Sequence, residues 1–98
     1  MLTVVAKLQV KADKTAAFEA EARKMIAHVK ENEPGTLTYT LHKSTADAGT
    51  YLFYEIYQDQ AAFAAHGGSP AMQAFFGAMG GVLEGRPELT MYETVLSK

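Results

Sequence analysis

The segment Tyr51-Leu52-Phe53-Tyr54-Glu55-Ile56-Tyr57 carries the strongest structural signal in this 98-residue sequence. Aromatic and branched apolar side chains fill it, and such residues favour an extended strand. Successive side chains of a strand point to opposite faces. The two sets are Tyr51, Phe53 and Tyr57 on one face and Leu52, Tyr54 and Ile56 on the other. This strand is therefore apolar on both faces, and each face needs a cover.

Three other segments show the alternation of a strand, at residues 2–11, 36–43 and 88–96. In the first of them the apolar side chains share one face. In the second a threonine-rich face lies opposite an apolar one, which favours a strand over a helix. The turn at residues 46–49 joins this second strand to the quoted stretch. Four strands are therefore expected.

Between the first two expected strands, apolar residues recur at helical spacing, which predicts a helix. Asp13 can cap the start of this helix, and the Glu-Pro-Gly sequence at 33–35 ends it. After the quoted strand, Asp59 can cap a short helix that runs through Ala65. The Ser-Pro pair at 69–70 then begins another helix. The apolar stripe of that helix comprises Met72, Phe75, Phe76, Met79, Val82 and Leu83.

The element order β-α-β-β-α-β predicts a ferredoxin-like α+β fold, in which a four-stranded antiparallel sheet carries both helical segments on one face. No repeat, linker or low-complexity tract divides the chain, so residues 1–98 are expected to form a single domain. The other face of the third strand is too apolar for water. A second copy of the sheet is the expected cover, because two-fold homodimers are the commonest assemblies. The sequence therefore predicts a dimeric α+β barrel.

Composition excludes several kinds of site and partner. The chain has no cysteine, which rules out disulfides, thiolate nucleophiles and Cys-based metal centres, and its histidines lack metal-ligand spacing. A net charge of −2 with scattered Lys and Arg argues against nucleic-acid binding. No apolar run reaches the ~20 residues of a membrane span, and no secretory signal is evident. We therefore expect a cytoplasmic protein without a metal, a nucleic-acid partner or a membrane partner.

Two residues are candidates for acid–base chemistry. Glu55 lies in the middle of the most apolar strand, where an unpaired carboxylate is costly, so it is expected to have a partner. It is either a general base or substrate anchor, or a structural carboxylate held by backbone donors or a cation. His66 follows Phe63 by three residues at a helix end, and an imidazole titrates near neutral pH. It either transfers protons or only hydrogen-bonds the following loop.

Aromatic residues are numerous for so short a chain, with five tyrosines and five phenylalanines. They can line a pocket for a flat ligand, and tyrosine hydroxyls can hold a phenol or quinone oxygen. They can equally form only the core.

A set of these residues, in this order and spacing, resembles a known family. The set comprises Glu33-Pro34-Gly35, Leu37, Tyr39, Phe53-Tyr54-Glu55-Ile56-Tyr57, Asp59, Ala62, Phe63, His66, Ser69-Pro70 and Leu83-Glu84-Gly85-Arg86-Pro87. Over nearly its full length the chain resembles the antibiotic biosynthesis monooxygenase family, and more closely the small bacterial branch that is similar to quinol monooxygenases.

The resemblance implies a homodimer whose pockets lie between helices and sheet. It also implies oxygenation of a small quinol-like or phenolic substrate without metal, flavin or haem, so no cofactor is expected. His66 is then the base, and Glu55 joins the groups that hold the substrate oxygens. The expected substrate-binding residues are the donors Tyr39, Tyr51 and Tyr57 and the water-excluding walls Phe53, Phe63 and Phe75.

Some positions differ from other branches of that family. Polyketide-oxidising members have tryptophan in place of Tyr57 and asparagine in place of Phe53, so a large tricyclic substrate is not expected. Haem-degrading members ligate iron through a histidine near the place of Phe75 and Phe76, so haem breakdown is not expected. Other relatives carry a second histidine where this chain has Ala71.

Three functions therefore stay open. The leading one is a cofactor-independent monooxygenase acting on a small quinol or phenol. The second is an isomerase of a small hydroxyketone, which uses the same histidine and tyrosines but consumes no oxygen. The third is a non-catalytic dimeric ligand-binding domain whose aromatic residues are only core and interface, and it predicts no cavity beside His66.

Overall fold

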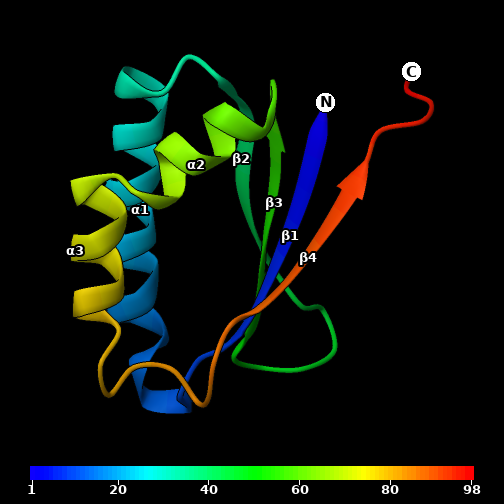
Figure 1. The fold of residues 1–98 in the computed structure, drawn as a ribbon. Coiled ribbons are helices and arrows are strands. Elements are labelled where there is room, and N and C mark those ends of the chain that lie inside the picture. The colour runs from blue at the N-terminus through cyan, green and yellow to red at the C-terminus, as the bar shows by residue number, and fades with distance from the viewer.

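Four antiparallel strands form one sheet in the computed structural model, which describes all residues 1–98 (Figure 1). The order across the sheet is β2-β3-β1-β4. The strands span Leu2–Gln9 (β1), Thr36–Lys43 (β2), Thr50–Tyr57 (β3) and Glu88–Glu93 (β4). The aromatic-rich segment Tyr51–Tyr57 lies in β3, which pairs with both β1 and β2. The predicted ferredoxin-like α+β fold is therefore confirmed.

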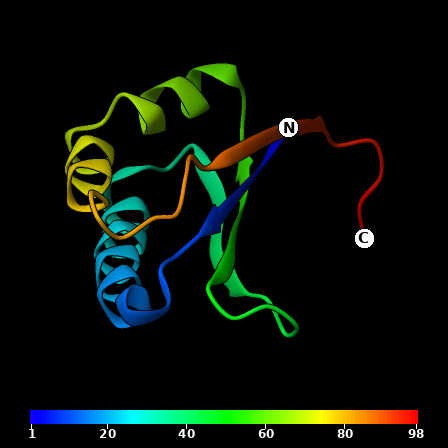
Figure 2. The same cartoon turned by 90° about the horizontal axis from the view of Figure 1, so that it is seen from below.

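Helices cover one face of this sheet (Figures 1 and 2). They span Thr15–Asn32 (α1), Gln60–Gly67 (α2) and Pro70–Ala78 (α3), and a short 3₁₀ helix at Ala12–Lys14 (η1) precedes α1. The side chains that α1 buries, at helical spacing, are Phe18, Ala22, Met25 and Val29. They pack with Met72 and Phe75 of α3 and with the inward-facing residues of β1 and β3 in one core. None of the helices combines the length and the apolar character that crossing a membrane requires.

The predicted cap of α2 and the predicted start of α3 are confirmed. The carboxylate of Asp59 accepts a hydrogen bond from the backbone N–H of Ala62 at 2.9 Å, at the start of α2. The hydroxyl of Ser69 accepts one from the backbone N–H of Met72 at 3.1 Å, at the start of α3. Both caps satisfy N–H groups that have no partner inside the helix. They fix the start of each helix, and thereby the place of His66 in the last turn of α2.

Some predicted boundaries are wrong. Asp13 does not cap α1, because it lies in η1, and α1 begins without a side-chain cap. Helix α3 ends at Ala78 instead of continuing to Leu83, since the chain turns at Gly81, whose φ of +76° suits glycine and few other residues. Strands β1 and β4 also end before the predicted residues 11 and 96.

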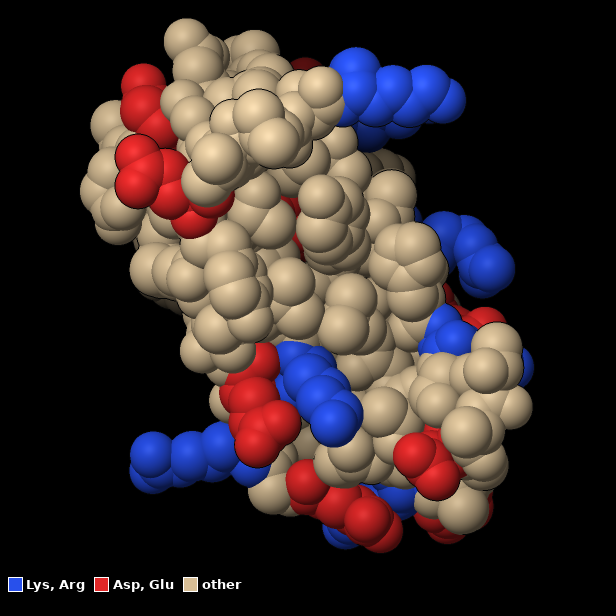
Figure 3. All heavy atoms as spheres, turned by 90° about the vertical axis from the view of Figure 1, so that its right-hand side faces the viewer, with Lys and Arg blue, Asp and Glu red and all other residues tan.

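The face of the sheet opposite the helices has no cover (Figure 2). The strand register places Val5 beside Tyr54 on this face, and Thr3 between Ile56 and Tyr92. Tyr54 is 38% exposed and Tyr92 is 55% exposed. Figure 3 views the molecule from this side and shows uncharged atoms across the centre, with charged residues mainly toward the margins. An apolar face of this kind marks an interaction surface, and the homodimer stays a prediction.

Candidate functional site

A cavity of about 120 Å³ lies between the sheet and helices α2 and α3. We call it the site cavity. Its wall contains residues from both helices and from all four strands or the segments next to them. Six of the eight predicted site residues meet there, namely Tyr39, Phe53, Glu55, Phe63, His66 and Phe75. The fold therefore brings together side chains that are far apart in the sequence.

Glu55 supplies the one carboxyl group in this wall. It is 5% exposed, and the hydroxyl of Tyr57 donates a hydrogen bond to its Oε1 at 2.6 Å. Burial raises the pKa of Glu55 to about 7; the bond from Tyr57 opposes this rise and the nearby charge of Glu33 adds to it. Glu55 therefore gains and loses a proton near neutral pH, as a general acid or base must.

Tyr39 and Tyr57 flank the imidazole of His66. Their ring centroids lie 4.9 Å and 5.5 Å from that of His66. Burial raises the pKa of both tyrosines far above the ordinary value, and Glu55 adds to the rise in each case. Their hydroxyls therefore stay protonated and act as hydrogen-bond donors. Tyr39 lines the site cavity, whereas Tyr57 lies behind the wall and acts on it through Glu55.

His66 is 3% exposed in the last turn of α2. Its Nδ1 lies 2.8 Å from Oε1 of Glu33, the residue that follows α1. This hydrogen bond ties α2 to the end of α1. The other ring nitrogen, Nε2, has no hydrogen-bond partner in the protein, and His66 lines the site cavity. Nε2 is therefore the nitrogen that a ligand can use.

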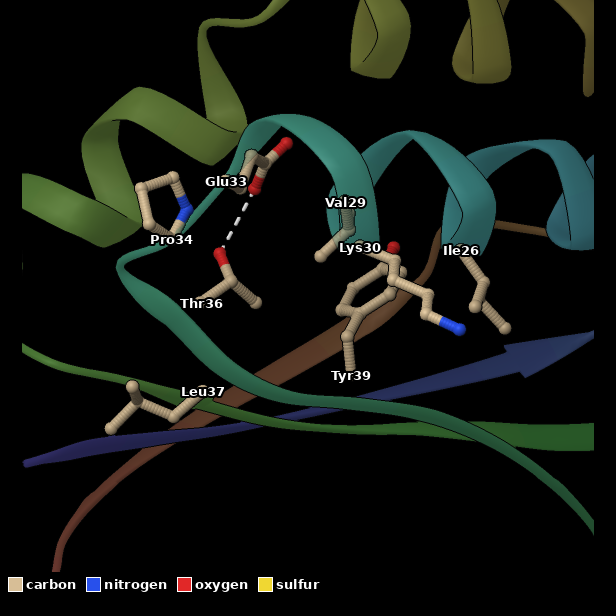
Figure 4. A pocket seen from close by; sticks show the side chains of 8 residues that line it. All are labelled: Ile26, Val29, Lys30, Glu33, Pro34, Thr36, Leu37 and Tyr39. Atoms are coloured by element: carbon tan, nitrogen blue, oxygen red, sulfur yellow. Dashed lines mark hydrogen bonds between the residues drawn. The ribbon is translucent and has the colours of Figure 1, made fainter.

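Glu33 is a residue of this site that sequence reasoning missed. Its side chain is 10% exposed, and the hydroxyl of Thr36 donates to the same Oε1 at 2.9 Å (Figure 4). It lies in the wall of a second cavity, of about 360 Å³, between the end of α1 and β2. In the sequence, Glu33 is part of a helix-ending motif and of the family resemblance, neither of which gave its side chain a role in the site. One signal was available, because a negative charge is unfavourable at a helix C-terminus and its presence there needs another reason.

Tyr51 lies at the other end of β3 and does not reach the site cavity. Its hydroxyl donates to Oε2 of Glu19 at 2.5 Å, and its ring packs against Phe18 with centroids 4.7 Å apart. Burial, followed by the bond to Glu19, raises the pKa of Tyr51 to about 12. The structure thus places Tyr51 in the core. Ala71, where other relatives have a second histidine, packs against the core from α3.

The histidines and carboxylates do not converge on one point. No group of three or more His, Asp or Glu side chains has an arrangement that could hold a metal ion. Glu33 lies between two histidines, with His66 at one oxygen and Nε2 of His28 3.4 Å from the other. The site cavity offers a ligand a carboxyl group, an imidazole and the hydroxyl of a protonated tyrosine.

Comparison with known proteins shows which family has this fold. A family model described as antibiotic biosynthesis monooxygenase matches residues 1–78. A protein from Caulobacter crescentus whose crystal structure is named for the same family is 37% identical, with a TM-score of 0.93, over 97% of this chain and 90% of that one. The structure of Rv0793 from Mycobacterium tuberculosis is 26% identical, with a TM-score of 0.88, over 98% of this chain and 96% of that one.

A similarity to a longer protein was also found. The uncharacterized protein sll1783 of Synechocystis is 25% identical over 92 residues, which include 94% of this chain. The chain spans 62% of the length of this curated relative. The family model matches most of the chain and the fold agrees with it throughout. The chain therefore belongs to the antibiotic biosynthesis monooxygenase family.

Proposed function

We propose that the protein is a monooxygenase that oxidises a small quinol or phenol with dioxygen and uses no metal, flavin or haem. The observation that supports this most directly is the meeting of a buried carboxyl group, Glu55, and a buried imidazole, His66, in one aromatic-walled cavity. A volume of about 120 Å³ suits a single aromatic ring better than a fused tricyclic system. Membership of the family supports the class of reaction.

In this reaction the substrate supplies the electrons. Loss of a phenol proton leaves an electron-rich anion that passes one electron to dioxygen, and the two radicals then combine to form a carbon–oxygen bond. One oxygen atom stays on the ring and the other leaves as water. A benzene-type quinol and one dioxygen thereby give a hydroxyquinone and one water, and all four electrons come from the quinol.

The residues of the cavity fit these steps. His66 takes the phenol proton at Nε2, the nitrogen without a protein partner. Tyr39 keeps its own proton and holds a substrate oxygen. Glu55, with a pKa of about 7, returns a proton to the oxygen that leaves. Phe53, Phe63 and Phe75 exclude water, which strengthens the charge interactions inside.

Isomerisation of a small hydroxyketone is the second candidate. The same near-neutral pKa of Glu55 favours it, because one group must remove a proton from carbon while another delivers one to the neighbouring oxygen. This reaction needs no dioxygen. A domain whose aromatic residues serve only as core gains no support, since it predicts no cavity beside His66.

Oxygen uptake with a panel of single-ring quinols and phenols tests the proposal. We expect wild type to consume oxygen faster than the uncatalysed reaction, also in the presence of a metal chelator. His66→Ala should lower the rate by roughly 10²- to 10⁴-fold, the usual contribution of a positioned base. His42→Ala, which removes an exposed histidine of β2, is the matched control. Equal rates for wild type and His66→Ala would exclude this mechanism, and hydroxyketone conversion without oxygen uptake would favour the isomerase.

The homodimer is part of the same proposal. The uncovered sheet face, with Val5, Tyr54, Ile56 and Tyr92, has the apolar character of a surface that a partner covers. A second copy of the chain is the occupant that this proposal assigns to it.

A further inference from the structure

Behind the wall of the site cavity, Glu33 lies between His66 and His28. Its Oε1 is 2.8 Å from Nδ1 of His66, and its Oε2 is 3.4 Å from Nε2 of His28. The exposed fraction of the side chain falls from 29% for His28 to 10% for Glu33 and 3% for His66. Oε2 of Glu33 is buried and forms no hydrogen bond of good geometry. A carboxylate buried in this way depends on donors that face it.

The hydrogen bonds determine which nitrogen of His66 carries the proton. A carboxylate oxygen accepts hydrogen bonds and donates none. Oε1 of Glu33 therefore accepts from the hydroxyl of Thr36, a bond that Figure 4 shows as a dashed line, and also from Nδ1 of His66. With its proton on Nδ1, the neutral ring has a lone pair on Nε2. Nε2 is then able to accept a proton from a ligand in the site cavity.

Asn32 determines the protonation of His28 in the same way. Its side-chain nitrogen donates to the carbonyl oxygen of His28 at 3.1 Å and lies 3.3 Å from Nδ1 of the same residue. A carbonyl oxygen only accepts, so the nitrogen of the Asn32 amide must be the atom at this position. Nδ1 of His28 is therefore an acceptor, and the ring proton lies on Nε2, which faces Glu33. Oε1 of Glu33 thus faces the Nδ1–H of His66, whereas Nε2 of His28 lies 3.4 Å from Oε2 without forming a hydrogen bond to it.

We infer that Glu33 is a positioning residue that holds His66 in the Nδ1–H form, so that Nε2 accepts the proton of the substrate. The consequence for catalysis rests on the proposed function, whereas the proton position is a property of the protein without substrate. Backbone packing supports the arrangement. A Cβ added at Gly35 would lie 2.7 Å from Cβ of Ala62, so the turn after Glu33 lies directly against the helix that carries His66.

The other ionisable groups around His66 do not replace Glu33. Tyr39 and Tyr57 contact the imidazole with their rings, and burial keeps both hydroxyls protonated. The carboxyl group of Glu55 is hydrogen-bonded to Tyr57. Nδ1 of His66 bonds to none of these three residues. Removal of Glu33 should therefore leave the Nδ1–H without an acceptor.

Nitrogen–proton correlation spectra of the imidazole rings test the inference without any substrate, because the two neutral tautomers have different nitrogen shifts. We expect wild-type His66 as the Nδ1–H form. Glu33→Ala should move it toward the Nε2–H form that free histidine favours. Glu33→Gln keeps the volume but has one acceptor oxygen where the carboxylate has two, so it should give a mixture. Glu31→Ala, at an exposed position of the same helix end, is the control and should leave His66 unchanged.

Kinetics give the second readout. Glu33 does not line the site cavity, so its loss should lower kcat and leave KM nearly unchanged. We expect a decrease of roughly 10- to 100-fold for Glu33→Ala, like that for hydrogen-bond partners of other functional histidines, and a smaller one for Glu33→Gln. An unchanged Nδ1–H signal in folded Glu33→Ala or, if that variant does not fold, in Glu33→Gln would overturn the inference. If wild type oxidises no quinol, the proposed function fails while the spectra still decide the role of Glu33.

Discussion

Glu55 is buried and has a pKa near neutrality, and its burial causes the shift in pKa. Its carboxyl group loses water in the middle of β3, and the hydrogen bond from Tyr57 offsets only part of that loss. The ionised form is therefore unfavourable for the folded state. A side chain of this kind is a candidate for function because a group that titrates near neutral pH exchanges protons readily with a substrate.

We predict that Glu55→Gln gains stability relative to wild type as pH rises from about 5 to about 8. Folding raises the pKa of Glu55 from 4.5 to about 7, so the folded protein binds this proton more tightly than the unfolded chain. Wild-type stability therefore falls as pH rises through this interval, whereas glutamine does not titrate. The difference between the two free energies of unfolding should change by about 2.5 kcal/mol in favour of the variant. Urea unfolding at both pH values measures it, and a difference independent of pH would refute the prediction.

For individual side chains, the sequence predicted some locations in the structure and missed others. Alternation along the strand placed Glu55 on the buried face, where the structure has it. Alternation specifies a face but no position along the strand. Tyr51 and Tyr57 share a face, yet they lie six positions apart along the strand, which is about 20 Å, so only one of them is near His66. The contact of Glu33 with His66 joins residues 33 positions apart and depends on tertiary packing.

Helix α2 owes its place to close packing against the turn between α1 and β2. We predict that Gly35→Ala lowers turnover, because the new Cβ would lie 2.7 Å from Cβ of Ala62 and the helix must shift away from Glu33. The overlap should also cost about 1–3 kcal/mol of stability. Ala62→Gly removes the opposing carbon, so the double variant should recover turnover, although glycine inside a helix costs about 1 kcal/mol. Thermal unfolding measures the loss of stability, and turnover assays of both variants measure the loss and recovery of activity. A double variant as slow as Gly35→Ala would show that this contact does not position α2.

Elements with a local signal were predictable, and those shaped by tertiary packing were not. The caps at Asp59 and Ser69 follow from side chains that bond to the next backbone N–H groups. Met79 and Val82 continue the helical spacing of α3 and are buried, but they lie beyond its end at Ala78. The spacing of apolar residues therefore predicted which side chains are buried but overestimated the length of the helix.

The whole molecule has one apolar face without a cover, and the account requires a partner there. We predict that wild type is a dimer at micromolar concentration and that Ile56→Glu is a monomer. Ile56 lies on the uncovered face beside Thr3, and an unpaired carboxylate in an interface costs several kcal/mol. Ala27→Glu, on an exposed position of α1, is the control and should remain dimeric. Sedimentation equilibrium distinguishes these outcomes, and a monomeric wild type would contradict the prediction.

The fold of the whole chain was predictable because the order of strands and helices leaves few topologies. The number of helical segments also indicated that they cover only one face of the sheet. The reaction was not predictable to the same degree. Function resides in the arrangement of a few side chains, and the same fold can hold different chemistry.

The proposed reaction transfers one oxygen atom from dioxygen to the substrate, and mass spectrometry of the product formed under isotopically heavy dioxygen measures this transfer. We expect the quinone product to gain one heavy oxygen atom and the second heavy atom to appear in water. His66→Ala should form this product far more slowly. A product without heavy oxygen, formed by wild type at the full rate, would contradict the account.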